Sequence, residues 1–247
     1  MRDHQIASND HQLRCLGVTD GDRPWIMEQR WEHVLFCHWR YPAEVVRSVV
    51  PDGLDIDTRD GSAWVSVVPL RLAHVHLRDL PPLPDLSHFA ELNVRTYVTR
   101  NGQPGVWFLS IDAGNSACSW IGRCIFHAPY HDAEVRLEGD GPYEFSSDRG
   151  GGAKFDVRYE PTGDPFQPES NSLELFLSER YAMYVRTRTG RVLRGAVQHD
   201  PWVLQHAVAD ITVNTALEAV RLPAPDAAPM TFYSEGTNSD VCFLERV

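Results

Sequence analysis

Short runs of alternating apolar and polar residues, separated by turn signals, follow one another along most of the chain. Asp60-Gly61 and Thr189-Gly190 are typical of the tight turn between two hairpin strands. Period-two alternation in short segments is typical of strands that have one buried face. The pattern predicts strands at residues 31–39, 54–57, 62–77, 91–100, 106–112, 130–137, 143–147, 154–159, 180–188, 191–197, 230–233 and 240–244.

A three-to-four-residue spacing of apolar positions, which indicates a helix, is rarer. Four short helices are predicted, at 42–50, 115–126, 172–177 and 213–220. Asn115 or Ser116 can cap the second of these helices. Its apolar positions form one face, which we expect to be buried. They are Ala117, Trp120, Ile121, Cys124 and Ile125.

Strands and helices do not alternate regularly, which argues against a doubly wound parallel sheet. The chain is therefore expected to be mainly β, with an antiparallel barrel or a pair of packed sheets and a few short helices. No linker or repeat divides it. We expect a single domain over residues 23–247, preceded by an arm or lead-in over residues 1–22.

Composition and charge exclude several classes of partner. The net charge of −11 and the lack of a basic run argue against nucleic acid. No apolar stretch reaches the 18 or so residues of a membrane span, and residues 1–22 lack the apolar centre of a signal peptide. The five cysteines include no C-x-x-C pair, which favours free thiols in a reducing compartment. The expected location is the cytoplasm.

Chemistry-bearing residues concentrate in the strand around residues 91–98. Glu91, Asn93, Arg95 and Tyr97 share one face of this strand, and apolar residues occupy the other. The polar face either meets solvent or lines a wet cavity that holds a small molecule. In the second case Glu91 and Arg95 would supply an acid/base group and an anion clamp, and Arg95 would keep Glu91 ionised.

Other polar clusters leave alternatives open. Glu179, Arg180 and Tyr181 either line the mouth of a pocket or form a structural ion pair. His38, which neighbours a tryptophan, is either a ligand contact or a hydrogen-bonded histidine of the core. The sequence contains no H-E-x-x-H, G-x-S-x-G or phosphate-binding glycine loop, so no metal site and no cofactor are expected.

Several stretches together resemble the YqjF-like family of uncharacterised bacterial proteins, which is distantly related to acetoacetate decarboxylase. The similarity covers about residues 25–245, and the block E-L-N-V-R-T-Y-V at 91–98 is its most specific part. The matching stretches lie at 31–39, 60–65, 91–98, 105–108, 129–130, 176–181 and 199–202. The resemblance implies a cone-shaped antiparallel β-barrel with an internal pocket.

The resemblance also implies a departure from the decarboxylase mechanism. In acetoacetate decarboxylase a lysine that follows a proline forms a Schiff base with the substrate. The matching stretch here is Ala128-Pro129-Tyr130-His131, which has no lysine, and Lys154 is the only lysine of the chain. Glu91 matches a glutamate that lines the decarboxylase pocket. A Schiff-base decarboxylase is therefore not expected.

Two functional hypotheses remain. In the first, the barrel binds a small carboxylate or keto acid and performs lyase- or isomerase-type acid/base chemistry, with Glu91, Arg95, Tyr130 and His131 as the catalytic candidates. In the second, it is a non-catalytic barrel that binds or senses a small molecule. The ligand-contact candidates are His38, Asn93, Tyr97, Glu179, Arg180 and Tyr181. The fold is compatible with a homo-oligomer.

Overall fold

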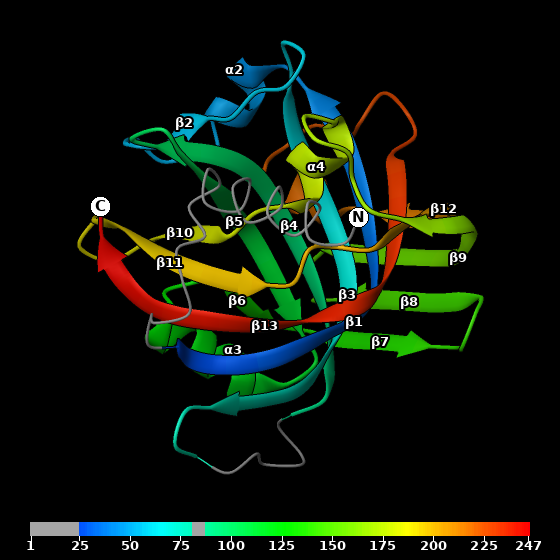
Figure 1. Ribbon diagram of the computed structural model, residues 1–247, viewed down its shortest axis with the longest axis horizontal. Helices are drawn as coiled ribbons and strands as arrows, with labels where there is room; N and C mark the ends of the chain where they lie inside the picture. The colour runs from blue at the N-terminus through cyan, green and yellow to red at the C-terminus, as the bar shows by residue number, and fades with distance from the viewer. Residues whose placement is uncertain (1–24, 81–86) are drawn as a thin grey trace, which may run out of the picture.

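The structure, a computed structural model, describes residues 25–80 and 87–247, and the arm expected at 1–22 lies outside these ranges. Seven strands form a closed barrel, in which the last strand pairs back to the first (Figure 1). Neighbours pair antiparallel, apart from the short parallel pairing of β5 with β10. In barrel order the strands are β1 (Trp25–Tyr41), β3 (Ala63–Leu77), β4 (Phe89–Arg100), β5 (Gln103–Ala113), β10 (Ala182–Arg186), β11 (Val192–His199) and β13 (Met230–Arg246).

Four more strands continue the sheet from the beginning of β13 and form a wing beside the barrel (Figure 1). In order from β13 they are β12 (Leu204–Asn214), β9 (Lys154–Phe166), β8 (Tyr143–Asp148) and β7 (Glu134–Glu138). Two short strands, β2 (Asp55–Ile56) and β6 (Tyr130–Asp132), pair with β4 and β5. The mainly β barrel expected from the sequence is confirmed.

Four short helices complete the described residues. They are α2 (Ala43–Arg47), α3 (Ser116–Ile125), α4 (Leu173–Ser178) and α5 (Ala216–Ala219). The side chain of Asn115 caps α3, as expected, by accepting hydrogen bonds from the backbone N–H groups of Ala117 and Cys118. Within the ranges described, none of the helices has the length and apolar character needed to cross a bilayer.

Strand β4 separates two environments, because its alternate side chains point to opposite sides. Leu92, Val94 and Val98 pack in an apolar core with residues of the wing, including Phe155 and Tyr159. The opposite face of β4 is turned to the barrel interior. The two-faced pattern expected for this strand is confirmed. Glu91, Asn93 and Tyr97 of the polar face are buried, and Arg95 is half-buried.

The helix predicted at 213–220 is longer than the helix in the structure. Val213 and Asn214 end β12, and only Ala216–Ala219 are helical. Strand β12 itself was not predicted, because one of its faces meets solvent and still carries apolar residues such as Val208. When exposed positions also carry apolar residues, the alternation of apolar and polar residues that predicts a strand is weak.

The expectation that α3 buries its apolar face is wrong. Ala117, Trp120, Cys124 and Ile125 are exposed, and only Ile121 of the expected set is half-buried. The helix instead buries Ser119 and Gly122. A Cβ atom at Gly122 would lie 2.3 Å from the ring of Tyr130, so this residue must be small for the helix to approach β6.

Candidate functional site

The interior of the barrel contains a cavity whose wall is largely apolar. It leaves about 90 Å³ for the centres of water-sized molecules. One water needs about 10–15 Å³ by this measure, so the cavity has room for several waters or a small organic molecule. The apolar wall includes Val34, Phe36, Phe108, Ile111, Met183 and Trp202.

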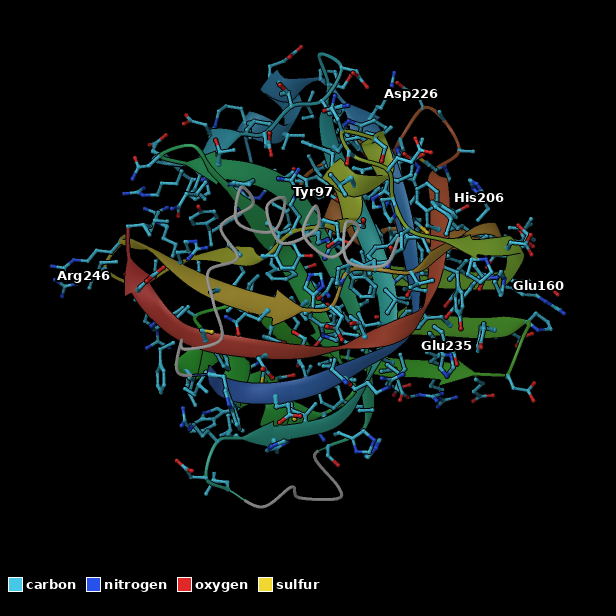
Figure 2. The ribbon with its side chains drawn as sticks, viewed as in Figure 1. Tyr97, Glu160, His206, Asp226, Glu235 and Arg246 are labelled. Atoms are coloured by element: carbon cyan, nitrogen blue, oxygen red, sulfur yellow. The ribbon has the colours of Figure 1, made fainter. Side chains whose placement is uncertain are left out.

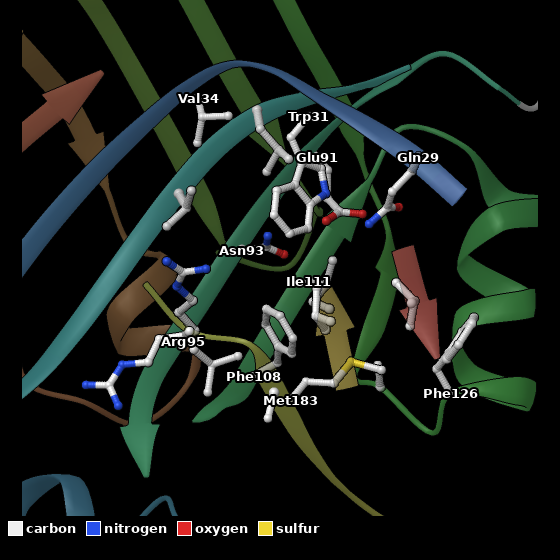
Figure 3. Close-up of a pocket in the computed structure, with 18 of the residues that line it drawn as sticks. Gln29, Trp31, Val34, Glu91, Asn93, Arg95, Phe108, Ile111, Phe126 and Met183 are labelled. Atoms are coloured by element: carbon white, nitrogen blue, oxygen red, sulfur yellow. The ribbon is translucent and has the colours of Figure 1, made fainter. Parts of the chain in front are cut away.

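The polar part of the wall is a row of side chains on β4. Glu91, Asn93 and Arg95 all line the cavity, because every second residue of a strand faces the same side. Figure 3 shows Glu91 at one end of this row, near Gln29, and Arg95 at the other. The Cα atoms of Glu91 and Arg95 are separated by about 13 Å at the usual strand rise. The row can therefore contact two ends of one small molecule.

Glu91 is buried and carries a strongly perturbed carboxyl group. Burial raises its pKa to about 8, and the nearby charge of Asp112 raises the pKa further, while hydrogen bonds from Tyr130 and Asn93 oppose the shift. Its Oε2 atom is buried without a hydrogen-bond partner. A carboxyl group with this pKa can exchange a proton near neutral pH. The expectation that Arg95 keeps Glu91 ionised is wrong, because burial dominates and raises the pKa of the carboxyl group.

Arg95 places a positive charge at the other end of the row. Its guanidinium lies 5.6 Å from the centre of the Phe36 ring. In the part of the chain that the structure describes, Arg95 forms no ion pair, and its buried Nε and Nη2 atoms have no hydrogen-bond partner. Burial lowers the pKa of His38 and of His199, and the charge of Arg95 lowers both further. An unpaired buried guanidinium is a site for an anion.

Tyr130 is held against Glu91 by the elements around it. Its backbone N–H donates to the carbonyl of Ala128, and its carbonyl accepts from Arg123. Its ring packs on Gly122 of α3. Burial and the charge of Glu91 raise the pKa of the hydroxyl well above its usual range, so the hydroxyl remains protonated and able to donate.

An acidic group behind the cavity was not found from the sequence. Asp112 on β5 is buried and accepts from Arg149 Nε at 2.8 Å and from Ser147 at 3.2 Å. Its two partners come from the region of β8, far away along the chain, so only the folded arrangement identifies the cluster. Asp112 does not line the cavity, and it acts on Glu91 through its charge.

The cluster at 179–181 has its polar groups satisfied. Glu179 accepts from the backbone N–H of Trp202 at 2.8 Å and from the hydroxyl of Tyr181 at 2.5 Å. Arg180 lines the cavity, but it pairs with Asp57 at 2.6 Å. These contacts are those of a structural cluster, with Arg180 alone reaching the cavity wall.

Three further candidates lie away from this cavity. Tyr97 and His38 meet at Ser66, whose hydroxyl is 2.7 Å from the hydroxyl of Tyr97 and 2.6 Å from His38 Nδ1. Tyr97 also donates to the carbonyl of Leu177. It lies in the body of the barrel (Figure 2). His131 lines a separate groove that also contains Arg149. The structure thus brings Glu91, Asn93, Arg95, Tyr130 and Arg180 together in one wall.

Strand β1 contributes cavity residues that the sequence did not point out. Met27, Gln29 and Trp31 line the cavity from alternate positions of β1. Their period-two spacing was available, but the strand was expected to begin only at Trp31. The Trp31 ring stacks on Trp202 with 5.4 Å between centres and 7° between planes.

Lys154 lies outside the cavity. Its side chain is half-exposed and pairs with Asp148 at 2.5 Å. Over residues 25–80 and 87–247, no three His, Cys, Asp or Glu side chains come together in an arrangement that could hold a metal ion.

Comparisons with known proteins agree on the fold and the family. The chain has the fold of the enduracididine biosynthesis enzyme MppR in its complex with pyruvate, with a TM-score of 0.65, 12% identity, and coverage of 93% of this chain and 92% of that one. An acetoacetate decarboxylase-like enzyme from Sphingomonas wittichii RW1 gives a TM-score of 0.63 at 13% identity, covering 91% and 94% of the two chains.

Sequence comparison gives a nearer relative. The uncharacterized protein YqjF of Bacillus subtilis (strain 168) is 38% identical over 235 residues, which cover 94% of this chain and 95% of the relative. The model of the DUF2071 family, described as an uncharacterized conserved protein, matches residues 28–238. The resemblance inferred from the sequence is confirmed, and the chain belongs to the DUF2071 family, with an acetoacetate decarboxylase-like fold.

Proposed function

We propose that the barrel binds a small carboxylate, such as a keto acid, and moves a proton at the carbon next to its carbonyl group. The observation that carries this proposal is the row of unpaired polar atoms on β4, which are Glu91 Oε2, Asn93 Oδ1, and Nε and Nη2 of Arg95. Buried polar atoms without partners in the protein are costly, and they are available to bind polar groups of a small molecule. The complex of the fold relative MppR with pyruvate supports the class of ligand.

Each end of the row has a distinct role in this reaction. Arg95 pairs with the carboxylate of the substrate, and Glu91 in its ionised form accepts the proton from carbon. The electron pair left behind forms an enolate, whose oxygen accepts a hydrogen bond from Tyr130. Returning the proton to the other face of the same carbon, or to a neighbouring atom, completes an isomerase-type reaction without an electron acceptor. In a lyase-type reaction the electron pair of the enolate instead expels a leaving group from the next carbon, and the proton on Glu91 passes to that leaving group.

This mechanism needs no Schiff base. A phenol cannot form an iminium ion with a ketone, and Tyr130 takes the place in the cavity wall that the resemblance gives to the catalytic lysine of acetoacetate decarboxylase. Lys154 is paired on the outside with Asp148. Lys154→Arg should therefore leave binding and turnover unchanged, and borohydride should trap no adduct with an oxo acid.

The test is the exchange of hydrogen for deuterium at the carbon beside the carbonyl of 2-oxobutyrate, followed by NMR, with binding measured by calorimetry. Wild type should catalyse exchange at a rate that rises as the pH passes through about 8, where Glu91 ionises. Glu91→Gln should bind the acid without exchange. Arg95→Met should bind it about 10- to 100-fold more weakly, the range for losing a charged hydrogen bond.

The outcomes separate the hypotheses. Equal exchange rates for Glu91→Gln and wild type would remove Glu91 from the mechanism. Binding without exchange in wild type would leave a non-catalytic barrel for small acids, which the largely apolar wall also favours. If neither 2-oxobutyrate nor other small acids bind, the proposal is wrong in both parts.

A further inference from the structure

A second cavity lies beside the first, between the outer half of β3 and helix α3. It leaves about 100 Å³ for the centres of water-sized molecules. Its wall is more apolar than that of the first cavity. Of its polar side chains, Gln29 and Tyr130 also line the first cavity, and His76 lines only the second. The lining includes Leu72, Val75, Leu77, Phe89, Ile121 and Phe126. A cavity of this kind favours a hydrocarbon group.

The two cavities share part of their walls. Met27, Gln29, Phe126 and Tyr130 line both of them. Methionine is unbranched and has three rotatable bonds, so it fills gaps of irregular shape and can move when a ligand needs the space. The boundary between the cavities is therefore made of side chains, and one of these, Tyr130, is the hydroxyl partner of Glu91.

The order of the polar side chains along the cavity wall determines which way a ligand is oriented. Arg95, Asn93 and Glu91 follow one another, and Gln29 lies beyond Glu91 (Figure 3). A molecule whose carboxylate meets Arg95 has its next atoms at Asn93 and Glu91. Any longer part continues past Tyr130 into the second cavity, where apolar side chains surround it.

We infer that the ligand is a monocarboxylic acid with an apolar tail of several carbons, and that the second cavity holds this tail. The inference rests on the proposed function, because it takes Arg95 as the anchor of the carboxylate. It adds the length and polarity of the remainder of the molecule. Gly122 contributes to this arrangement, because it lets Tyr130 pack closely against α3 and so line both cavities.

A series of straight-chain 2-oxo acids of three to ten carbons tests this inference by calorimetry. Affinity should rise about fourfold for each methylene that enters the second cavity, because burial of one methylene contributes about 0.8 kcal/mol. The rise should stop when the cavity is full. The shortest acids should bind to the first cavity alone and with the same dependence on Arg95 as the longer ones.

Variants at Ile121 decide where the tail lies, because this residue lines only the second cavity. Ile121→Trp should fill the space and abolish the rise with chain length, while the shortest acids bind as they do to wild type. Ile121→Ala should move the end of the rise to longer acids. Ile125→Trp is the matched control, since it makes the same change on an exposed part of α3.

Circular dichroism and thermal melting of each variant establish that it is folded before binding is measured. A flat series in wild type, with short acids still bound, would overturn the second cavity as a tail site and leave the proposed function standing. A rise that persists in Ile121→Trp would also overturn it. Absence of binding at every chain length would instead overturn the proposed function together with this inference.

Discussion

Two buried clusters that each combine a glutamate with an arginine behave differently in this molecule. Glu179 accepts hydrogen bonds from Trp202 and Tyr181, and Arg180 pairs with Asp57. In the row on β4, Glu91 and Arg95 keep buried atoms without partners. Both clusters combine a carboxylate with a guanidinium, and residue type alone does not distinguish them.

The difference lies in whether the fold itself supplies the partners. A buried polar group that is satisfied by the protein stabilises one structure, and a group left unsatisfied costs stability unless a ligand completes it. The 179–181 cluster fits the first case and the β4 row the second. The predictions below test this division through the free energy of unfolding, in order of expected size.

The largest effect is expected for Glu91→Gln, and it should depend on pH. Burial raises the pKa of Glu91 from about 4.5 to about 8, so the folded state holds this proton over a range where the unfolded state has lost it. The stability that neutral Glu91 contributes is complete below pH 4.5 and is lost as the pH rises to 8. Each pKa unit corresponds to about 1.4 kcal/mol, so the free energy of unfolding of the variant should exceed that of wild type by about 5 kcal/mol at pH 9.

Urea unfolding of both proteins at pH 5, 7 and 9 measures this difference. At pH 5 the two free energies of unfolding should agree within about 1 kcal/mol, since a protonated carboxyl group and an amide have similar shape and hydrogen-bonding capacity. A constant difference between the two proteins across this pH range would contradict the raised pKa.

The opposite sign is expected for Glu179→Ala. This change leaves the backbone N–H of Trp202 and the hydroxyl of Tyr181 buried without their acceptor. Each such group costs about 1–3 kcal/mol, so the free energy of unfolding should fall by about 3 kcal/mol. Glu160→Ala, on an exposed position of β9, is the control and should change it by less than 0.5 kcal/mol. A loss as small as that of the control would remove the division between the clusters.

A smaller effect is expected where α3 meets the cavity wall. Gly122→Ala should destabilise the protein by about 1–2 kcal/mol, because the new Cβ atom clashes with the ring of Tyr130 and outweighs the helical preference of alanine. It should also displace Tyr130 from Glu91. NMR titration of the Glu91 carboxyl group would detect the lost hydrogen bond as a further rise in its pKa, and an unchanged value would show that the ring had not moved.

Local rules were sufficient where one strand or turn determines the outcome. The alternation at 91–98 correctly separated the two faces of β4. Thr189-Gly190 lies between the paired strands β10 and β11, and Asp60-Gly61 turns the chain at the isolated bridge between Arg59 and Ser62. The rules failed for α3, where apolar residues face outward and the contact with β6 is made by Gly122. An apolar helix face predicts burial only where the small residues on the opposite face are not the ones that pack against the rest of the protein.

Only the site residues that share one face of a single strand could be predicted from the local sequence pattern. Glu91, Asn93 and Arg95 were identified because they share a face, and Tyr130 because of a family resemblance. Gln29 on β1 and Asp112 on β5 come near Glu91 only through the pairing of strands in the barrel, which no local pattern encodes. That the protein itself supplies hydrogen-bond donors to the Glu179 carboxylate could not be predicted for the same reason, since one donor, Trp202, lies 23 residues away.

The stacked pair Trp31 and Trp202 gives the cavity an optical reporter. Two parallel indole rings 5.4 Å apart couple their electronic transitions, so this pair should dominate the near-ultraviolet circular dichroism of the protein. Both rings line the space that a ligand would enter. Occupancy of the barrel should therefore be readable from the unlabelled protein, as a change in this signal and in tryptophan emission.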